Sequence, residues 1–104
     1  MAYYAIFDTD VFDAEGYKEY QGKVGVGVAA HGGKYLSAGG DLHLIEGDWQ
    51  LHRVVMLEFP DKGRFDAWYL SPDYQALKQI RDRTVRSKAF GVGGFEPTFK
   101  STHT

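Results

Sequence analysis

The 104-residue sequence has no cysteine, only three prolines and no long apolar run. Without cysteine the chain has neither a disulfide framework nor a thiol nucleophile, which fits a reducing compartment. The first residues lack the basic region and apolar run of a signal peptide, and no window is long enough to be a membrane span. We therefore expect a cytoplasmic protein.

The chain also has no large excess of positive or negative charge. Twelve lysines and arginines face fourteen acidic residues, for a formal net charge of −2. No overall field therefore draws the protein to nucleic acid or to an anionic membrane. One local basic run consists of Lys78, Arg81, Arg83, Arg86 and Lys88. Asp82 interrupts this run, and no aromatic side chains lie within it to stack on bases. A solvated helix face is therefore favoured over nucleic-acid binding.

What the chain does have is enough apolar material for one core, with 43% hydrophobic and 15% aromatic residues. This length fits a single domain, which we place at residues 1–104, with a core of about 2–96 and a loosely held C-terminal tail. Small domains bury a modest share of their surface, and oligomerisation is a common remedy.

The order of apolar patterns predicts strand, helix, strand, strand, two helices and strand. Residues 2–11 form a strand with apolar side chains on both faces. A helix capped by Asp13 runs to Gly32 and Gly33, with an apolar stripe on Tyr17, Tyr20, Val24 and Val28. Strands at 34–38, 41–46 and 49–59 come next, then helices capped by Asp61 and Ser71, then a strand at 88–96.

Gly47 and Asp48 form a two-residue hairpin signal between the second and third strands. A turn there places His43 opposite His52 and Leu42 opposite Arg53. Because side chains alternate along a strand, one face of the third strand carries Leu51, Arg53, Val55, Leu57 and Phe59, and the other carries His52, Val54, Met56 and Glu58.

Two tandem strand–helix–strand units predict a ferredoxin-like α+β sandwich, with helices on one face of an antiparallel sheet. The other face would normally be polar. Here it carries Val54 and Met56, and the first strand offers a second apolar surface. Burying this face requires a second copy of the sheet, so we predict a face-to-face homodimer.

Four segments carry a resemblance to a known family: His31–Leu36, Glu46–Trp49, Arg53–Pro60 and Trp68–Gln75. Together they are similar to the domain of unknown function 1330 family over roughly residues 2–95. The resemblance implies the dimeric α+β barrel superfamily and no particular activity. More distant relatives of that fold include cofactor-free monooxygenases, polyketide cyclases, muconolactone isomerases and haem-degrading enzymes, an analogy of fold alone.

His31 and Arg53 are the candidate catalytic residues. A helix C-terminus stabilises an imidazolium, which suits His31 to acid–base chemistry. Arg53 lies on an apolar strand face, where its charge needs a carboxylate partner or an anionic ligand. In the structural alternative, His31 only caps the helix and Arg53 pairs with an acidic residue within the subunit or across the dimer.

Aromatic side chains are the candidates for binding a flat organic ligand: Tyr17, Trp49, Trp68, Tyr69 and Tyr74, with Tyr20 and Phe65 beside them. Most of them should belong to the core. Glu58, on the expected dimer face, is either a base or a hydrogen-bond acceptor across the interface. His43, His52 and Asp41 have metal-ligand chemistry but no tight spacing motif, so no metal is predicted.

These features predict a homodimer with one small-molecule pocket per subunit, between the helices and the sheet. If it is an enzyme, we expect cofactor-independent chemistry of monooxygenase, isomerase or cyclase type on an enolisable or aromatic metabolite. The alternative is a non-catalytic ligand-binding or interaction module. No cofactor, nucleic acid or membrane partner is predicted.

Overall fold

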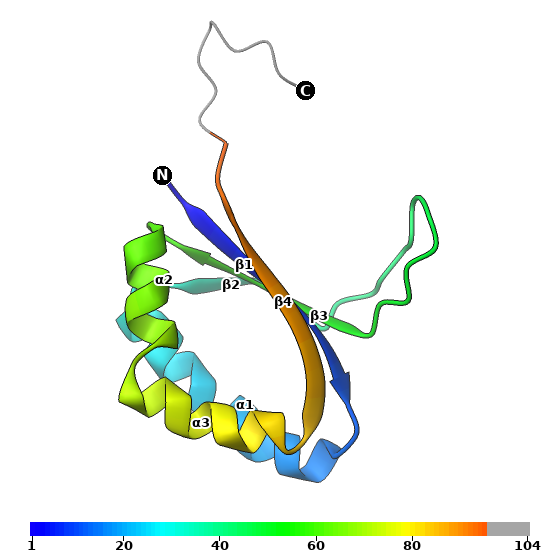
Figure 1. The fold of residues 1–104 in the computed structure, drawn as a ribbon, viewed down its shortest axis with the longest axis horizontal. Helices are drawn as coiled ribbons and strands as arrows, with labels where there is room; N and C mark the ends of the chain where they lie inside the picture. Colours follow the sequence, from blue (N-terminus) through cyan, green and yellow to red (C-terminus); the bar gives the residue numbers. More distant parts are fainter. Residues whose placement is uncertain (96–104) are drawn as a thin grey trace, which may run out of the picture.

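The computed structural model describes residues 1–95, which form a four-stranded sheet and three helices (Figure 1). Along the chain the elements are β1 Tyr3–Val11, α1 Ala14–Ala30, β2 Lys34–Ala38, β3 Arg53–Phe59, α2 Lys62–Tyr69, α3 Pro72–Asp82 and β4 Val85–Gly93. None of these helices is long and apolar enough to span a bilayer.

The strands lie in the order β2-β3-β1-β4, and every neighbouring pair is antiparallel. The three helices cover one face of this sheet (Figure 1). Each half of the chain is a strand–helix–strand unit whose two strands are separated by a strand from the other half. This arrangement confirms the predicted ferredoxin-like α+β sandwich.

All three helices begin at the side chains that the sequence predicted as caps. Asp13 accepts a hydrogen bond from the Gly16 amide at 3.1 Å, and Asp61 accepts one from the Arg64 amide at 2.7 Å. The Ser71 hydroxyl accepts from the Tyr74 amide at 3.1 Å, just before the proline that opens α3. Each cap pairs an amide that the first helical turn leaves without a partner.

The core lies between the sheet and the helices, and Trp68 of α2 is its centre. Its side chain is 2% exposed, and its ring lies 5.5 Å from that of Phe59 and 4.3 Å from that of Tyr74. The predicted stripe of α1 is confirmed, since Tyr17, Tyr20, Val24 and Val28 are all buried. Aromatic packing of this kind contributes beyond the area that it buries.

The faces predicted for β3 are confirmed. Leu57 and Phe59 are buried under the helices, and Arg53 and Val55 point to the same side. Val54, Met56 and Glu58 point to the outer face. The register adds Ile6 of β1 and Phe90 of β4 to that face, where the Phe90 side chain is 55% exposed.

The predicted hairpin at Gly47 is wrong. Among the described residues, 39–52 contribute no strand, and β2 pairs directly with β3, Lys34 opposite Glu58 and Ala38 opposite Val55. Residues 39–52, which we call the arm, extend away from the sheet (Figure 1). Gly39 starts the arm with a φ of +77°, a backbone conformation that glycine adopts readily. A strand at 41–46 would have had no layer of the domain to pack against, which explains why it does not form.

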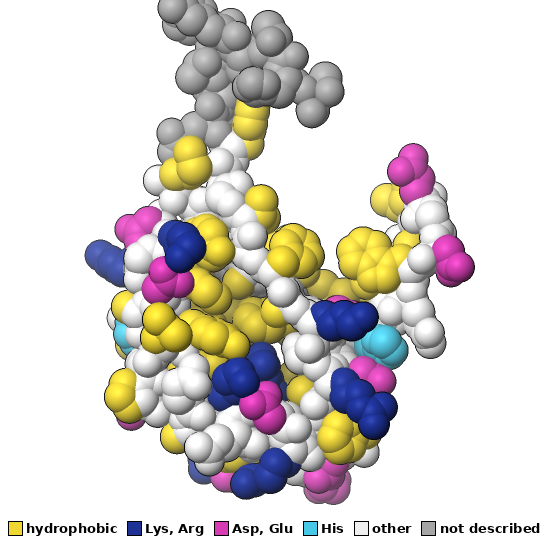
Figure 2. All heavy atoms as spheres, viewed as in Figure 1, with side chains coloured by type: hydrophobic (Ala, Val, Ile, Leu, Met, Phe, Trp, Pro, Cys, Tyr) yellow, Lys and Arg dark blue, Asp and Glu magenta, His cyan; other side chains and the backbone are white. Residues whose placement is uncertain are grey.

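Hydrophobic side chains of the arm remain exposed, Leu42, Leu44, Ile45 and Trp49 among them. Figure 2 shows such side chains both on the arm and on the facing part of the domain. Since the pairing of His43 with His52 and of Leu42 with Arg53 depended on the hairpin, neither pairing forms.

The last strand begins three residues earlier than the predicted 88–96, at Val85. Thr84 follows Arg83, the C-cap of α3, and its hydroxyl donates to the carbonyl oxygens of Ile80 and Arg81, both at 3.0 Å. Val85 then pairs immediately with Val11. The predicted end at Glu96 and the predicted loose tail lie outside the described residues.

Replacing Gly33 with alanine should destabilise the fold by about 1–3 kcal/mol, as overpacking does. An added Cβ would lie 2.6 Å from Cε2 of Phe59 and 2.8 Å from Cγ1 of Val28. The matched control is Gly22→Ala on α1, where an added Cβ meets nothing within 4 Å, so helix propensity should stabilise by up to about 1 kcal/mol. Urea unfolding measures both; equal effects would contradict this packing.

Candidate functional site

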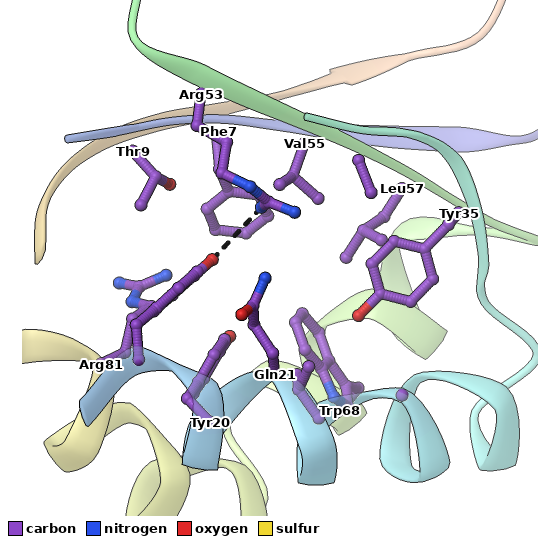
Figure 3. Close-up of a pocket in the computed structure, with 14 residues that line it drawn as sticks. Phe7, Thr9, Tyr20, Gln21, Tyr35, Arg53, Val55, Leu57, Trp68 and Arg81 are labelled. Atoms are coloured by element: carbon purple, nitrogen blue, oxygen red, sulfur yellow. Dashed lines mark hydrogen bonds between the residues drawn. The ribbon is translucent and has the colours of Figure 1, made fainter. Parts of the chain in front are cut away.

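A cavity of about 260 Å³ lies between α1 and the helix-facing side of the sheet (Figure 3). Residues from β1, α1, β2 and β3 form most of its wall, and Trp68 of α2 and Arg81 of α3 complete it. Alternating positions of the sheet supply Phe7, Thr9, Val55 and Leu57, because side chains two apart on a strand share a face.

The two ends of the cavity differ in polarity. One end is apolar, with Val55, Leu57 and the rings of Trp68 and Tyr35 (Figure 3). Thr9 and the Arg81 guanidinium lie toward the other end, and the Gln21 amide extends from α1 toward the sheet between that end and Trp68 (Figure 3). A flat body and a polar head would each find a matching surface here.

Arg53 is half-buried, on β3 opposite Thr9 of β1. Its Nη1 donates to the Tyr17 hydroxyl at 3.3 Å, and its guanidinium carbon lies 5.7 Å from the centre of that ring. Gly39 lies so close that a Cβ there would be 2.9 Å from Nε of Arg53. Within residues 1–95 no carboxylate forms an ion pair with Arg53, so the predicted partner within the subunit is not found.

Arg81 is buried, which corrects the prediction of a solvated basic face at this position. Its side chain is 9% exposed, and its guanidinium lies 5.6 Å from the centre of the Phe7 ring. Nη1 donates to the Tyr74 hydroxyl at 3.3 Å, Nη2 lies 3.7 Å from a carboxylate oxygen of Asp82, and Nε is buried with no hydrogen-bond partner among residues 1–95. Arg81 lies two turns after Tyr74 and so shares its inward face.

Tyr20 and Tyr74 form a buried pair under the cavity, with their hydroxyl oxygens 2.9 Å apart. Burial raises the pKa of both hydroxyls, and the effect is largest for Tyr20. For Tyr74 the nearby Arg81 charge opposes the rise of the pKa without cancelling it. Both groups therefore stay protonated at neutral pH.

The structure brings four of the candidate residues to the cavity: Arg53, Tyr17, Tyr20 and Trp68. Tyr69 and Tyr74 lie behind the wall, where their rings pack 5.2 Å apart. Trp49 is on the arm and 59% exposed. Whether the residues at the cavity bind a ligand stays a prediction.

His31 does not reach the cavity. It ends α1, and its Nδ1 lies 2.9 Å from the carbonyl oxygen of Gly27, an interaction of the helix-capping kind. The structure therefore does not bring His31 and Arg53 together as a catalytic pair in one pocket, and the contacts of His31 are those of the structural alternative.

Of the remaining candidates, His52 and Glu58 make local polar contacts. The backbone amide of His52 donates to Asp8 at 2.8 Å, and its Nδ1 lies 3.2 Å from the same carboxylate. Glu58 lies 3.4 Å from Nζ of Lys34 on the outer face. In the part of the chain that the structure describes, no three His, Cys, Asp or Glu side chains gather as a metal site.

Four polar lining residues were not singled out as ligand-binding from the sequence: Thr9, Gln21, Tyr35 and Arg81. The sequence pattern could have indicated two of these residues. Thr9 continues the alternation of Ala5 and Phe7, and Gln21 follows Tyr17 by one helical turn. Tyr35 lies on β2, and its place at the cavity depends on the direct pairing of β2 with β3, which the sequence did not predict.

The tyrosine pair predicts alkaline sensitivity. In the unfolded chain both hydroxyls ionise near pH 10, whereas the fold holds their protons to higher pH. Unfolding above pH 10 therefore releases protons, and the free energy of unfolding should fall by up to about 1.4 kcal/mol per pH unit for each tyrosine. Below pH 10 this pair adds no slope. Urea unfolding between pH 9 and 11 measures the pH dependence of the free energy of unfolding. If this dependence were the same in Tyr20→Phe as in the wild type, the buried tyrosine pair would not be its cause.

Three comparisons place the chain among known proteins. A family model described as Domain of unknown function (DUF1330) matches residues 2–95. Among curated proteins no similar sequence was found. Solved structures with the same fold include RPA0582, a protein of unknown function from Rhodopseudomonas palustris, with a TM-score of 0.75, 21% identity, and coverage of 92% of this chain and 84% of that one.

A second similar structure is SnoaB, a cofactor-independent oxygenase from Streptomyces nogalater, with a TM-score of 0.66 and 13% identity over 96% of this chain and 98% of that one. Rv0793 from Mycobacterium tuberculosis has a TM-score of 0.57 and 9% identity over 93% and 98%. At these identities the similarity shows the fold alone. The match over residues 2–95 shows that the chain belongs to the DUF1330 family.

Proposed function

We propose that the protein binds a small organic anion with an apolar body in the cavity between α1 and the sheet. The observation that carries this is Arg53, a half-buried guanidinium that lines the cavity and whose one hydrogen bond within residues 1–95 goes to the neutral Tyr17 hydroxyl. A guanidinium in such a setting gains most from a carboxylate, which it binds with two parallel hydrogen bonds.

Charge supports the same conclusion. The cavity lining includes two arginines and no aspartate or glutamate. Charges within low-dielectric walls act more strongly than charges in bulk water, so an anion is attracted and a cation is repelled. The neighbouring hydroxyls of Thr9 and Tyr17 add neutral polar groups for its oxygens.

The apolar end of the cavity determines the shape and polarity of the ligand's body. Trp68 and Tyr35 offer ring surfaces, and Val55 and Leu57 close the sheet side (Figure 3). A body the size of a substituted benzene ring suits a cavity of about 260 Å³. An aromatic or conjugated acid therefore fits better than a sugar or a large nucleotide.

Two uses of such a pocket remain proposals. SnoaB, which has the same fold, is a cofactor-independent oxygenase. This similarity favours a cofactor-independent enzyme of monooxygenase, isomerase or cyclase type that acts on such an acid. The alternative is a non-catalytic ligand-binding module. In either case Arg53 holds the anion and Trp68 and Tyr17 contact the body, while His31 enters only as the cap of α1.

Benzoate should raise the melting temperature of the protein. A benzoate concentration of about a hundred times Kd stabilises the folded state by about 2.7 kcal/mol, which raises the melting temperature by roughly 11–22 °C for a domain of this size. Arg53→Met should weaken binding roughly tenfold to a hundredfold, because a charge-assisted hydrogen bond is lost. Thermal shift and calorimetric titration measure both effects.

Two controls make the assignment specific. Arg64→Met removes an exposed guanidinium on α2 and should leave benzoate binding unchanged. Gly25 lines the cavity and its added Cβ would meet nothing within 4 Å, so Gly25→Leu should block binding, whereas Gly22→Leu, three residues away and outside the lining, should not. Stabilisation that persists in Arg53→Met, or that no small acid produces, would refute the proposal.

We also propose that the outer sheet face forms a homodimer. Single-chain packing leaves Phe90 55% and Val92 48% exposed there, beside the half-buried Ile6 and Met56. A continuous apolar face of this kind is costly to leave in water, and a second copy offers the same surface in return. The cytoplasmic location stays a prediction.

Phe90→Glu should convert a wild-type dimer to a monomer, because each copy would place an unpaired carboxylate in the interface. Val26→Glu is the matched control, since Val26 is 78% exposed on α1, away from the sheet face, and this variant should remain dimeric. Analytical ultracentrifugation at micromolar concentration distinguishes them. A monomeric wild-type protein would exclude this assembly.

A further inference from the structure

Three side chains under the cavity form a continuous set of hydrogen bonds. Arg81 of α3 donates through Nη1 to the Tyr74 hydroxyl at 3.3 Å, and the Tyr74 hydroxyl lies 2.9 Å from that of Tyr20 on α1. We call this set the Arg81–Tyr74–Tyr20 relay. All three side chains are buried, and Tyr74 is the most deeply buried at 2% exposed.

The direction of the relay follows from which groups have hydrogens. A guanidinium only donates, so the Tyr74 oxygen must accept from Arg81. The Tyr74 hydroxyl hydrogen then needs an acceptor, and within residues 1–95 the oxygen of Tyr20 is the one beside it. If Tyr20 donated instead, the hydrogen of the more deeply buried Tyr74 would have no acceptor, which is costly. The favoured order is Arg81 to Tyr74 to Tyr20.

This order leaves the Tyr20 hydroxyl hydrogen free, and Tyr20 is the member of the pair that lines the cavity. Figure 3 shows its hydroxyl directed from α1 toward the sheet, on the side of the cavity where Thr9 and Arg81 lie. Arg81 is more than nine-tenths buried and also lines this side of the cavity. This part of the cavity is therefore rich in donors and holds no anionic acceptor.

We infer that the Arg81–Tyr74–Tyr20 relay binds an ionised oxygen of the ligand, so that the preferred ligands are aromatic or conjugated compounds with an acidic hydroxyl, held as the phenolate or enolate. The inference rests on the proposed function and adds to it, because Arg53 accounts for one anionic group only. A guanidinium at the far end polarises both hydroxyls, which strengthens the last hydrogen bond in a low-dielectric site.

The probe for this inference is 4-nitrophenol, whose ionised form absorbs visible light, so that its pKa is measured directly in free and bound states. The wild-type protein should lower the pKa of the bound probe by about one unit or more, which corresponds to a tenfold preference for the phenolate. Tyr20→Phe should remove most of that preference, because the terminal donor is lost.

Tyr74→Phe is the decisive variant, because Tyr74 does not line the cavity and can act only through its relay partners Tyr20 and Arg81. It should return the pKa of the bound probe about halfway or more to the free value. The matched control is Tyr69→Phe, which removes a hydroxyl from a ring that packs 5.2 Å from Tyr74 but has no part in the relay. That control should bind the probe as the wild type does.

The outcomes separate the two proposals. If neither benzoate nor 4-nitrophenol binds the wild-type protein, both fall. If benzoate binds through Arg53 while 4-nitrophenol does not bind, or has the same bound pKa in wild type and in Tyr74→Phe, only the relay is refuted. A pKa that moves equally in Tyr69→Phe also refutes it. Circular dichroism of each variant confirms that the fold is retained.

Discussion

The pairing of β1 with both β3 and β4 is the constraint on which the rest of the structure depends. It places Phe7 opposite Val55 and Thr9 opposite Arg53, so that one side of the sheet faces the helices with an apolar region next to a charged one. A shift of one residue would move every side chain of a strand to the other face. The same register that buries the core therefore builds the cavity wall and leaves Ile6 and Phe90 on the outside.

Much of this architecture could be predicted from the sequence because its signals are local. A serine or aspartate cap acts within one helical turn, and the alternation along β3 sorts its side chains without knowledge of its neighbours. The hairpin prediction failed for the opposite reason. Gly47 does adopt a left-handed φ of +80°, yet a turn residue makes a hairpin only when both flanking segments have a layer to cover, and the arm has none.

The candidate site was only partly predictable, and Arg53 and Arg81 show why. Arg53 stood out because its strand neighbours are apolar, so its charge had to be explained. Arg81 lies among other charged residues in the sequence, and that context favours a solvated face. Only the packing of α3 against α1 reveals that its side chain points inward with Tyr74. Burial of a cation among aromatic rings is costly and is decided by tertiary contacts.

The position of the arm has a consequence for how this family can diversify. The chain leaves the sheet after Ala38 and returns at Arg53, and both residues line the cavity. Side chains from Gly39 to Gln50 are exposed, so insertions and deletions there would disturb few core contacts. Such changes would act at the rim of the cavity, so related proteins could reshape the cavity by altering one loop while the sheet and helices stay as they are.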